Sequence, residues 1–282
     1  MQVIKPAGPV WLPFYKLKAT DLSDKKSIFP LFLSELIGTA LLLSIGLSIV
    51  IFFWAKGSPV TRLIPNEALR RAVNGFLFGC TGCAITLSRV GKISGAHINP
   101  AVSIAFWIRG KMKTKALVGY VISQMLGAVI GCVPLLLWGA KGSSVDYGNT
   151  VPAYGLGPAF LGEMITTAAL ITVIFVFVGK ESLRHYTPYT MPFLYCIMVC
   201  IEAPFSGCST NPARSFGPAF ISGVYTAYWL YWIAPFAGVV IVTGLFRFFR
   251  LREYYRIEAA RLSYHNSPTH ESIKTTDKVF KE

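Results

Sequence analysis

Charged side chains are scarce in this chain of 282 residues, which contains only 13 Asp and Glu. Charged residues of both signs make up 14%, whereas a soluble globular domain carries about 25%. The chain therefore has too few charges to cover a surface that faces water. Hydrophobic residues reach 53% and the mean hydropathy is +0.52. These values also exclude a disordered chain, because disorder requires few apolar residues.

Cysteines are also few, at 6, and all except Cys208 lie inside apolar stretches. That placement argues against a disulfide scaffold. Cys80 and Cys83 have the spacing of a redox motif, but they lie on a predicted membrane helix, where we interpret them as small packing residues. The sequence contains no grouping of side chains typical of catalysis or of metal ligands. We therefore expect a protein that is not an enzyme and that uses no cofactor and no metal.

Long apolar runs fill most of the chain. A helix that crosses the hydrocarbon of a bilayer needs about 20 mostly apolar residues. Six runs come close to this length or exceed it: Phe29–Trp54, Ala72–Ser88, Ala116–Trp138, Leu156–Val178, Tyr186–Ala203 and Tyr225–Phe249. The predicted fold class is an all-α polytopic membrane protein. Its membrane domain covers 29–250, between a basic N-terminal tail, 1–28, and a basic C-terminal tail, 251–282.

The net charge of +14 indicates either a nucleic-acid partner or a membrane protein with basic cytoplasmic loops. With six spans both tails lie on one side, together with the segment from Arg89 to Lys115 and with Lys180 and Arg184. The opposite side carries only a few cations: Lys56, Arg62, Arg70, Arg71 and Lys141. The positive-inside rule then predicts that both termini are cytoplasmic. We expect an integral protein of the plasma membrane, with no nucleic acid among its partners.

Two halves of the chain repeat each other. The first span contains Glu35 in a segment that resembles the one around Glu163 in the fourth span. The tripeptide Asn99-Pro100-Ala101 returns as Asn211-Pro212-Ala213. Because an odd number of spans separates the repeated units, the halves must be inverted across the membrane, with a shared site near the midplane. The predicted halves are about 29–138 and 156–249.

Each Asn-Pro-Ala segment is predicted to begin a half-helix that enters the membrane without crossing it. Asn is a good N-cap and Pro suits the first helical position. The apolar residues that follow, Ala101–Ile108 and Ala213–Ile221, are too few to span the hydrocarbon at about 1.5 Å per residue. Irregular backbone at membrane depth is tolerated only beside a cavity or inside protein. Inversion brings one half-helix in from each side, so that their starts meet in the middle.

These segments resemble the aquaporin and aquaglyceroporin family, the major intrinsic proteins. The similarity covers about 28–250 and rests on the paired Asn-Pro-Ala motifs, on Glu35 and Glu163, and on Arg214-Ser215-Phe216-Gly217 after the second motif. It implies a six-helix bundle with two re-entrant half-helices, assembled as a homotetramer in the lipid bilayer with one pore per subunit. The implied function is a passive channel for water that excludes protons and ions.

The residues and the resemblance agree on the roles at the pore centre. Each half-helix start carries about half a positive charge, which repels cations. The amides of Asn99 and Asn211 can each donate to one water, whose neighbours then orient in opposite directions and interrupt a proton wire. By resemblance, Arg214 is the filter arginine near the extracellular mouth, with a structural ion pair as the alternative.

Glu35, Glu163 and His97 are expected to support the pore. Buried carboxylates need partners, so both glutamates should accept hydrogen bonds from irregular backbone near the half-helices. Proton relay is the alternative role for the two glutamates. His97 precedes Asn99 by two residues and is expected near the cytoplasmic vestibule, either as a satisfied structural histidine or as a pore-lining one.

The solute range depends on the filter, whose members we find by counting from each Asn without gaps. The count gives Gly79 in the second span, Val199 in the fifth and Cys208 before the second motif, together with Arg214. Gly79 and Val199 are small, so the resemblance implies a wider constriction and passage of small neutral solutes such as glycerol, urea and metalloid acids. A shift by one residue would put Phe78 in place of Gly79. Water-type residues at four other diagnostic positions point the opposite way: Ser215, Ala219, Tyr231 and Trp232.

Two other functions remain open from the sequence. An ion-coupled or proton-coupled transporter would need ionisable relay residues near the midplane, where Asn99 and Asn211 are neutral. A mainly structural membrane protein of the same fold would need neither Arg214 nor the paired Asn-Pro-Ala motifs. The sequence therefore favours a passive channel.

Overall fold

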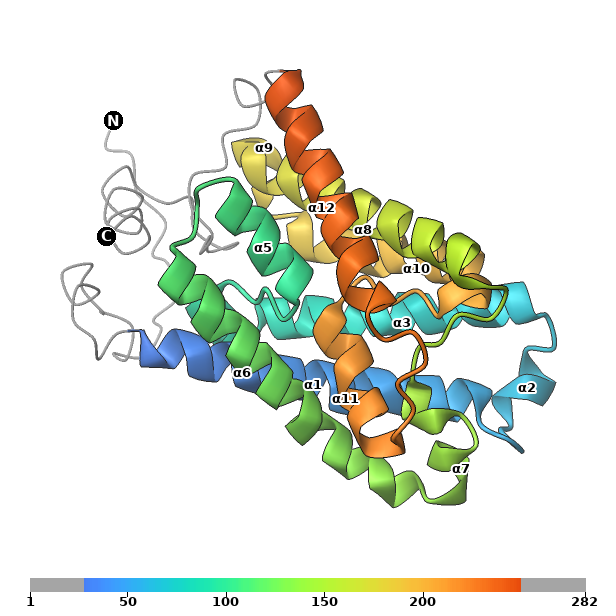
Figure 1. Ribbon diagram of the computed structural model, residues 1–282. Coiled ribbons are helices and arrows are strands. Elements are labelled where there is room, and N and C mark those ends of the chain that lie inside the picture. Colours follow the sequence, from blue (N-terminus) through green and yellow to red (C-terminus); the bar gives the residue numbers. More distant parts are fainter. Residues whose placement is uncertain (1–27, 250–282) are drawn as a thin grey trace, which may run out of the picture.

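The computed structural model describes residues 28–249, and this part of the chain is built from helices without a strand (Figure 1). The long helices are α1 (Phe29–Trp54), α3 (Glu67–Leu87), α6 (Thr114–Cys132), α8 (Leu156–Gly179), α10 (Thr187–Ser206) and α12 (Leu230–Phe248). Two shorter helices follow the Asn-Pro-Ala motifs: α5 (Pro100–Ile108) and α11 (Pro212–Ser222). Short helical turns lie in the connections: α2 (Val60–Leu63), α4 (Arg89–Ser94), η3 (Val133–Trp138), α7 (Ala140–Ser143), η4 (Asp146–Gly148) and α9 (Glu181–Arg184).

In the described residues, 5 helices are long and apolar enough to cross a membrane, judged by length and composition. They are α1, α8, α10, α12 and the segment Thr114–Trp138, which joins α6 to η3. The remaining predicted span lies in α3. With 21 residues this helix is long enough to cross a membrane, but Glu67, Arg70 and Arg71 in its first turns make it less apolar. The architecture therefore confirms the predicted fold class, an all-α polytopic membrane protein with two half-helices.

Two predicted spans begin at different residues for local reasons. α3 begins at Glu67 instead of Ala72, because the Asn66 side chain caps its first turn. α12 begins at Leu230 instead of Tyr225, because the residues before it form turns after α11 ends. The other long helices keep to the predicted positions within a few residues.

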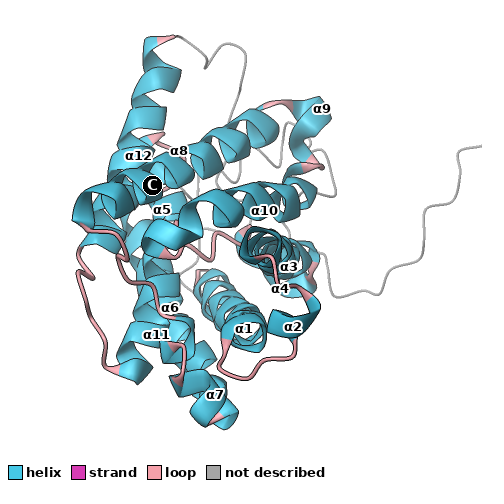
Figure 2. Cartoon of the chain, turned by 90° about the vertical axis from the view of Figure 1, so that its right-hand side faces the viewer, coloured by secondary structure: helices cyan, strands magenta, loops and turns pink. Residues whose placement is uncertain are grey.

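Glycines let the long helices approach each other closely in both halves. α1 packs along α6, α8 packs along α12, and α3 packs against α10 (Figure 2). A Cβ atom at Gly127 of α6 would collide with the Leu36 carbonyl oxygen of α1. A Cβ atom at Gly238 of α12 would lie 2.5 Å from the Met164 carbonyl oxygen of α8. Small residues at helix contacts are typical of membrane bundles, and here they sit at matching places in the two repeated units.

The half-helices are enclosed by the bundle, while the outer surface is apolar. α5 packs against α6 and α12, and α11 packs against the same two helices. The polar side chains of Glu35, Gln124 and Glu163 are fully buried. Large apolar side chains are exposed on the outward faces of the long helices, among them Ile122, Leu126, Ile130, Ile165, Ile197 and Ile201. Polar groups inside and apolar groups outside suit a bundle surrounded by lipid.

Candidate functional site

The two half-helices begin at Asn99 and Asn211, whose side chains cap them as the sequence predicts. The Asn99 Oδ1 atom accepts a hydrogen bond from the Ala101 amide at 2.8 Å. The Asn211 Oδ1 atom accepts from the amides of Ala213 at 3.0 Å and Arg214 at 3.3 Å. Both amide oxygens are therefore occupied, which leaves the NH₂ groups of the two asparagines for other partners.

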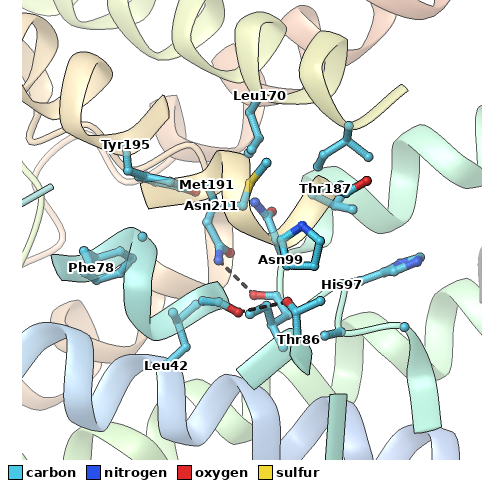
Figure 3. A pocket seen from close by; sticks show the side chains of 18 of the residues that line it. Leu42, Phe78, Thr86, His97, Asn99, Leu170, Thr187, Met191, Tyr195 and Asn211 are labelled. Carbon is cyan, nitrogen blue, oxygen red and sulfur yellow. Dashed lines mark hydrogen bonds between the residues drawn. The ribbon is translucent and has the colours of Figure 1, made fainter. Parts of the chain in front are cut away.

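These NH₂ groups connect the two halves of the protein. Asn99 Nδ2 donates to the Thr210 carbonyl oxygen, and Asn211 Nδ2 donates to the Ile98 carbonyl oxygen, both at 2.9 Å. An amide NH₂ group has two hydrogens, so each asparagine keeps one hydrogen beyond this bond. Both asparagines border a single cavity, in which Figure 3 shows them next to each other. The remaining hydrogens are donors for a molecule inside that cavity.

The backbone before each asparagine is strained at equivalent positions. Ala96 and Ile98 have φ of 50° and 43°, and Cys208 and Thr210 both have φ of 53°. Ala96 and Cys208 lie three residues before the asparagine of their loop, and Ile98 and Thr210 directly precede it. Each residue with a Cβ atom in the left-handed region costs about 1–3 kcal/mol. The surrounding structure must therefore hold both loops in this conformation.

A fully buried carboxylate holds the first loop. Glu35 on α1 accepts hydrogen bonds from the amides of His97 at 2.9 Å and Ile98 at 2.7 Å. Gln124 of α6 donates to the same carboxylate at 2.8 Å. Glu35 thus supplies acceptors for backbone N–H groups that have no water or helix partner at this depth.

Glu163 on α8 holds the second loop in the same way. It accepts from the amides of Ser209 at 2.6 Å and Thr210 at 2.7 Å, and from the Ser206 hydroxyl at 2.6 Å. The Ser206 hydroxyl also contacts Glu202, so a second buried carboxylate lies on this side. Fixed protein donors surround both span glutamates, which supports the predicted positioning role over the proton-relay alternative.

A cavity of about 90 Å³ extends from the two asparagines toward Thr86 at the end of α3 and Thr187 at the start of α10. This is the side of the bundle on which α1 begins and α12 ends. A water molecule needs roughly 10–15 Å³ of such space, so the cavity has room for several. Apolar side chains supply most of its wall: Leu42, Phe78, Val102, Leu170, Ile174 and Met191.

His97 borders the cavity and is also held firmly. Its ring stacks on Phe106 with the centroids 4.9 Å apart, and its Nδ1 atom lies 3.1 Å from the Ser103 hydroxyl. Only 5% of the residue is exposed. The sequence left two interpretations open for His97, a satisfied structural histidine and a pore-lining one. The side chain is held by neighbours and also borders the cavity, so the two interpretations do not exclude each other.

Arg214 lies in the first turn of α11, with 6% of its surface exposed. Its Nη1 atom donates to the Gly148 carbonyl oxygen at 2.8 Å. Within residues 28–249 the ion pairs join Glu67 to Arg70 and to Arg71, and none includes Arg214. The ion pairs of the described residues thus give no support to a structural ion pair at Arg214, the alternative that the sequence left open. Its guanidinium has further N–H donors beyond the one that Gly148 accepts.

The loop that carries Gly148 is tied to the half-helix. The Thr150 hydroxyl lies 2.7 Å from the Ser215 hydroxyl of α11. The Ser215 hydroxyl in turn lies 2.6 Å from the Ser209 hydroxyl in the strained loop. These contacts fix the carbonyl group that orients Arg214.

The structure brings the predicted filter residues Val199 and Cys208 together. Their exposed fractions are 8% and 4%, and they share an apolar cluster with Met198. Neither borders the cavity described above. Since Val199 follows the cavity residue Tyr195 along α10, the cluster lies on the far side of the asparagine pair.

Gly79 has a packing role that the sequence did not reveal. A Cβ atom at Gly79 would lie 2.6 Å from the Pro192 Cα atom and 2.7 Å from the Met191 carbonyl oxygen. The missing side chain therefore allows α3 and α10 to pack closely, although Gly79 does border the cavity. The aromatic ring that lines the cavity at this level belongs to Phe78, the alternative that a shift by one residue allows.

Sequence reasoning misses several residues at the site. Tyr195 borders the cavity four residues before Val199, and the period of a helix could have placed both on one face. Gln124 and Ser206 donate to the two buried carboxylates, but nothing in the sequence marks them as partners. Gly148 acts through its carbonyl group, which no side-chain pattern indicates.

Known proteins resemble this chain in sequence and in fold. A family model described as Major intrinsic protein matches residues 23–246. The chain is 31% identical over 228 residues to the probable aquaporin TIP2-2 of Arabidopsis thaliana, covering 79% of this chain and 89% of that protein. It is 33% identical over 210 residues to aquaporin NIP1-1 of Zea mays, covering 74% and 70%. The X-ray structure of the aquaglyceroporin from Plasmodium falciparum has a similar fold, with a TM-score of 0.63 at 22% identity over 78% of this chain and 95% of that chain.

Gly79 and Gly82 on α3 give a matched test of the packing role. Gly79→Ala places a methyl group against the α10 backbone, and we expect a loss of about 1–3 kcal/mol from overpacking. A Cβ atom at Gly82 has no heavy atom within 4 Å, so Gly82→Ala should unfold near the wild-type temperature. Thermal unfolding in detergent compares the two variants. Equal midpoints for both would contradict the packing role of Gly79.

A second prediction concerns the carboxylate of Glu163. Glu163→Gln replaces one oxygen by an NH₂ group that faces a backbone N–H, and an unsatisfied buried donor costs about 1–3 kcal/mol. We expect a lower midpoint of thermal unfolding than for the wild type. Glu181→Gln, at an exposed position in α9, is the control and should not change the midpoint. A Glu163→Gln protein as stable as the wild type would show that the amides do not need this carboxylate.

Proposed function

This chain belongs to the major intrinsic protein family, and from that premise we propose that it is a passive channel that conducts water and excludes protons and ions. The chain is an integral membrane channel and not an enzyme. One observation carries the proposal of a water pathway: Asn99 and Asn211 border the same cavity, each with one amide hydrogen that the protein does not use across the halves.

A water molecule between the asparagines accepts a hydrogen bond from Asn99 and another from Asn211. Its oxygen then has no free lone pair, and its two hydrogens point along the pore away from the centre. Water molecules on the two sides therefore orient in opposite directions. This arrangement interrupts the hydrogen-bonded chain along which a proton would move, while water itself passes.

Positive charge near the pore centre accounts for the exclusion of ions. The starts of α5 and α11 meet at the asparagines, and each carries a partial positive charge of about half a unit. Arg214 adds a full charge on the far side. The carboxylates of Glu35 and Glu163 face loop amides. A cation at the asparagines would thus lose hydration while the carboxylates of Glu35 and Glu163 stay bound to the loops.

Passage of small neutral solutes is the second candidate function. Val199 and Cys208 are small and lie together, so the filter that they form with Arg214 has little side-chain bulk. This favours glycerol, urea and metalloid acids at that level of the pore. The missing side chain of Gly79 also serves helix packing, so the proposal of a wider filter relies mainly on Val199 and Cys208.

The proposed orientation places the side on which α1 begins in the cytoplasm. Cations gather on the loops of that side, at Arg89, Lys92, Lys111, Lys113, Lys115, Lys180 and Arg184, in keeping with the positive-inside rule. Both termini are then cytoplasmic, in the tails 1–27 and 250–282 that are outside the described residues, and the plasma membrane is the proposed location. Assembly as a homotetramer in the bilayer belongs to the same proposal and rests on membership of the family.

Osmotic swelling of proteoliposomes tests the proposed function. We expect water permeability several-fold above that of protein-free vesicles, with glycerol entry close to that of the bare bilayer. The measurement is light scattering in a stopped-flow instrument, with urea as a further solute. Water permeability equal to that of protein-free vesicles would contradict the proposal, and glycerol or urea entry would favour the second candidate.

Arg214 is expected to contribute to ion exclusion and not to folding alone. Arg214→Val removes a positive charge that pairs with no carboxylate among the described residues, so proton or cation leakage should rise above the wild-type level while water still passes. Arg62→Val, at an exposed position in α2, is the control and should not leak. A pH-sensitive dye inside the vesicles reports the proton flux. Unchanged leakage in a folded, water-conducting Arg214→Val protein would remove this role.

A further inference from the structure

The aromatic side chains of Phe78 and Tyr195 end the cavity near the two asparagines. Both border the cavity, with ring centroids 5.9 Å apart. Figure 3 shows the two rings at one end of it, away from Thr187 and His97. Phe78 comes from α3 and Tyr195 from α10, so the pair lies where these helices of the two repeated units pack together.

Tyr195 stands between this cavity and the filter residues. It packs against the cluster that contains Val199 and Cys208. Neither of these two residues borders the cavity, and Arg214 does not border it either. Tyr195 is thus a residue that touches both the cavity and the cluster of Val199 and Cys208. The sequence counted Val199 as the filter member on this helix and gave no role to the residue one turn before it.

Neighbouring groups hold both rings in place. The Phe78 ring already packs on α1, since a Cβ atom at Gly46 would lie 2.6 Å from its Cε2 atom. The Tyr195 hydroxyl lies 3.0 Å from the Thr210 hydroxyl. Thr210 is fixed by the bond between its amide and Glu163 at 2.7 Å. The position of the phenol thus depends on the same carboxylate that holds the strained loop.

We propose that Tyr195, with Phe78 beside it, is the constriction that sets the size limit for permeating molecules. Its ring is much larger than the side chains of Val199 and Cys208, so the limit lies beside the asparagines and not at the outer filter. The hydroxyls of Tyr195 and Thr210 can donate and accept hydrogen bonds there. We therefore expect a single water to pass this polar point and the larger glycerol molecule to be excluded. This inference rests on the proposed water-channel function.

The test compares three variants of the full chain in proteoliposomes. Tyr195→Val removes the ring, and we expect glycerol entry to rise about tenfold, which corresponds to about 1.4 kcal/mol in the barrier, with water permeability kept or raised. Tyr195→Phe keeps the ring and should still exclude glycerol. Phe193→Val removes a ring from the outer face of the same helix, where 64% of Phe193 is exposed, and should behave as the wild type.

The outcomes separate this inference from the proposed function. If the wild type conducts water and Tyr195→Val still excludes glycerol, the constriction is elsewhere and only this inference fails. Glycerol entry through the wild type or Tyr195→Phe as fast as through Tyr195→Val would also overturn it. If neither the wild type nor any variant conducts water, the proposed function fails and takes this inference with it. A silent wild type with a conducting Tyr195→Val would contradict both proposals, because the ring would then close the path to water as well as to glycerol.

Discussion

Backbone N–H groups at membrane depth need acceptors inside the protein, and two buried carboxylates supply them here. Glu35 and Glu163 each bind two successive amides of a loop that contains positive φ angles. Without these bonds the loops would lose their partners and nothing would offset the strain. The loops set where the half-helices start, so the positions of Asn99, Asn211 and Arg214 all follow from this one interaction.

The two halves also position each other, because Asn99 donates to the second loop and Asn211 donates to the first. Each loop supplies one donor and one acceptor to this pair of hydrogen bonds, so a displacement of either loop alters both bonds. The two ends are nevertheless different in chemistry. One has the cavity with His97, and the other has Arg214 held by the carbonyl group of Gly148. The repeat thus builds a symmetric centre, and residues that differ between the two halves, such as His97 and Arg214, give each end its own chemistry.

The sequence predicts the parts of this site that depend on local rules. Asn before Pro marks a helix start, and a glutamate inside an apolar span must have a partner, so Asn99, Asn211, Glu35 and Glu163 can all be found. Gly79 and Phe78 show where such reasoning reaches its limit. A count from Asn99 back to α3 assumes a fixed path through the connection, and a difference of one residue turns the helix by about 100°. Tyr195 is missed because an aromatic residue in a span has no distinctive signal, and its place beside the cavity depends on how α3 packs on α10.

A map of the protein in lipid at a resolution that shows ordered water would reveal whether the two asparagines share one water. We expect a water whose oxygen is within hydrogen-bond distance of both Asn99 Nδ2 and Asn211 Nδ2. We also expect that the oxygens of Glu35 and Glu163 are bound to the loop amides and not to that water. A centre in which protein groups occupy both NH₂ groups completely, or in which a carboxylate faces the water, would contradict this expectation.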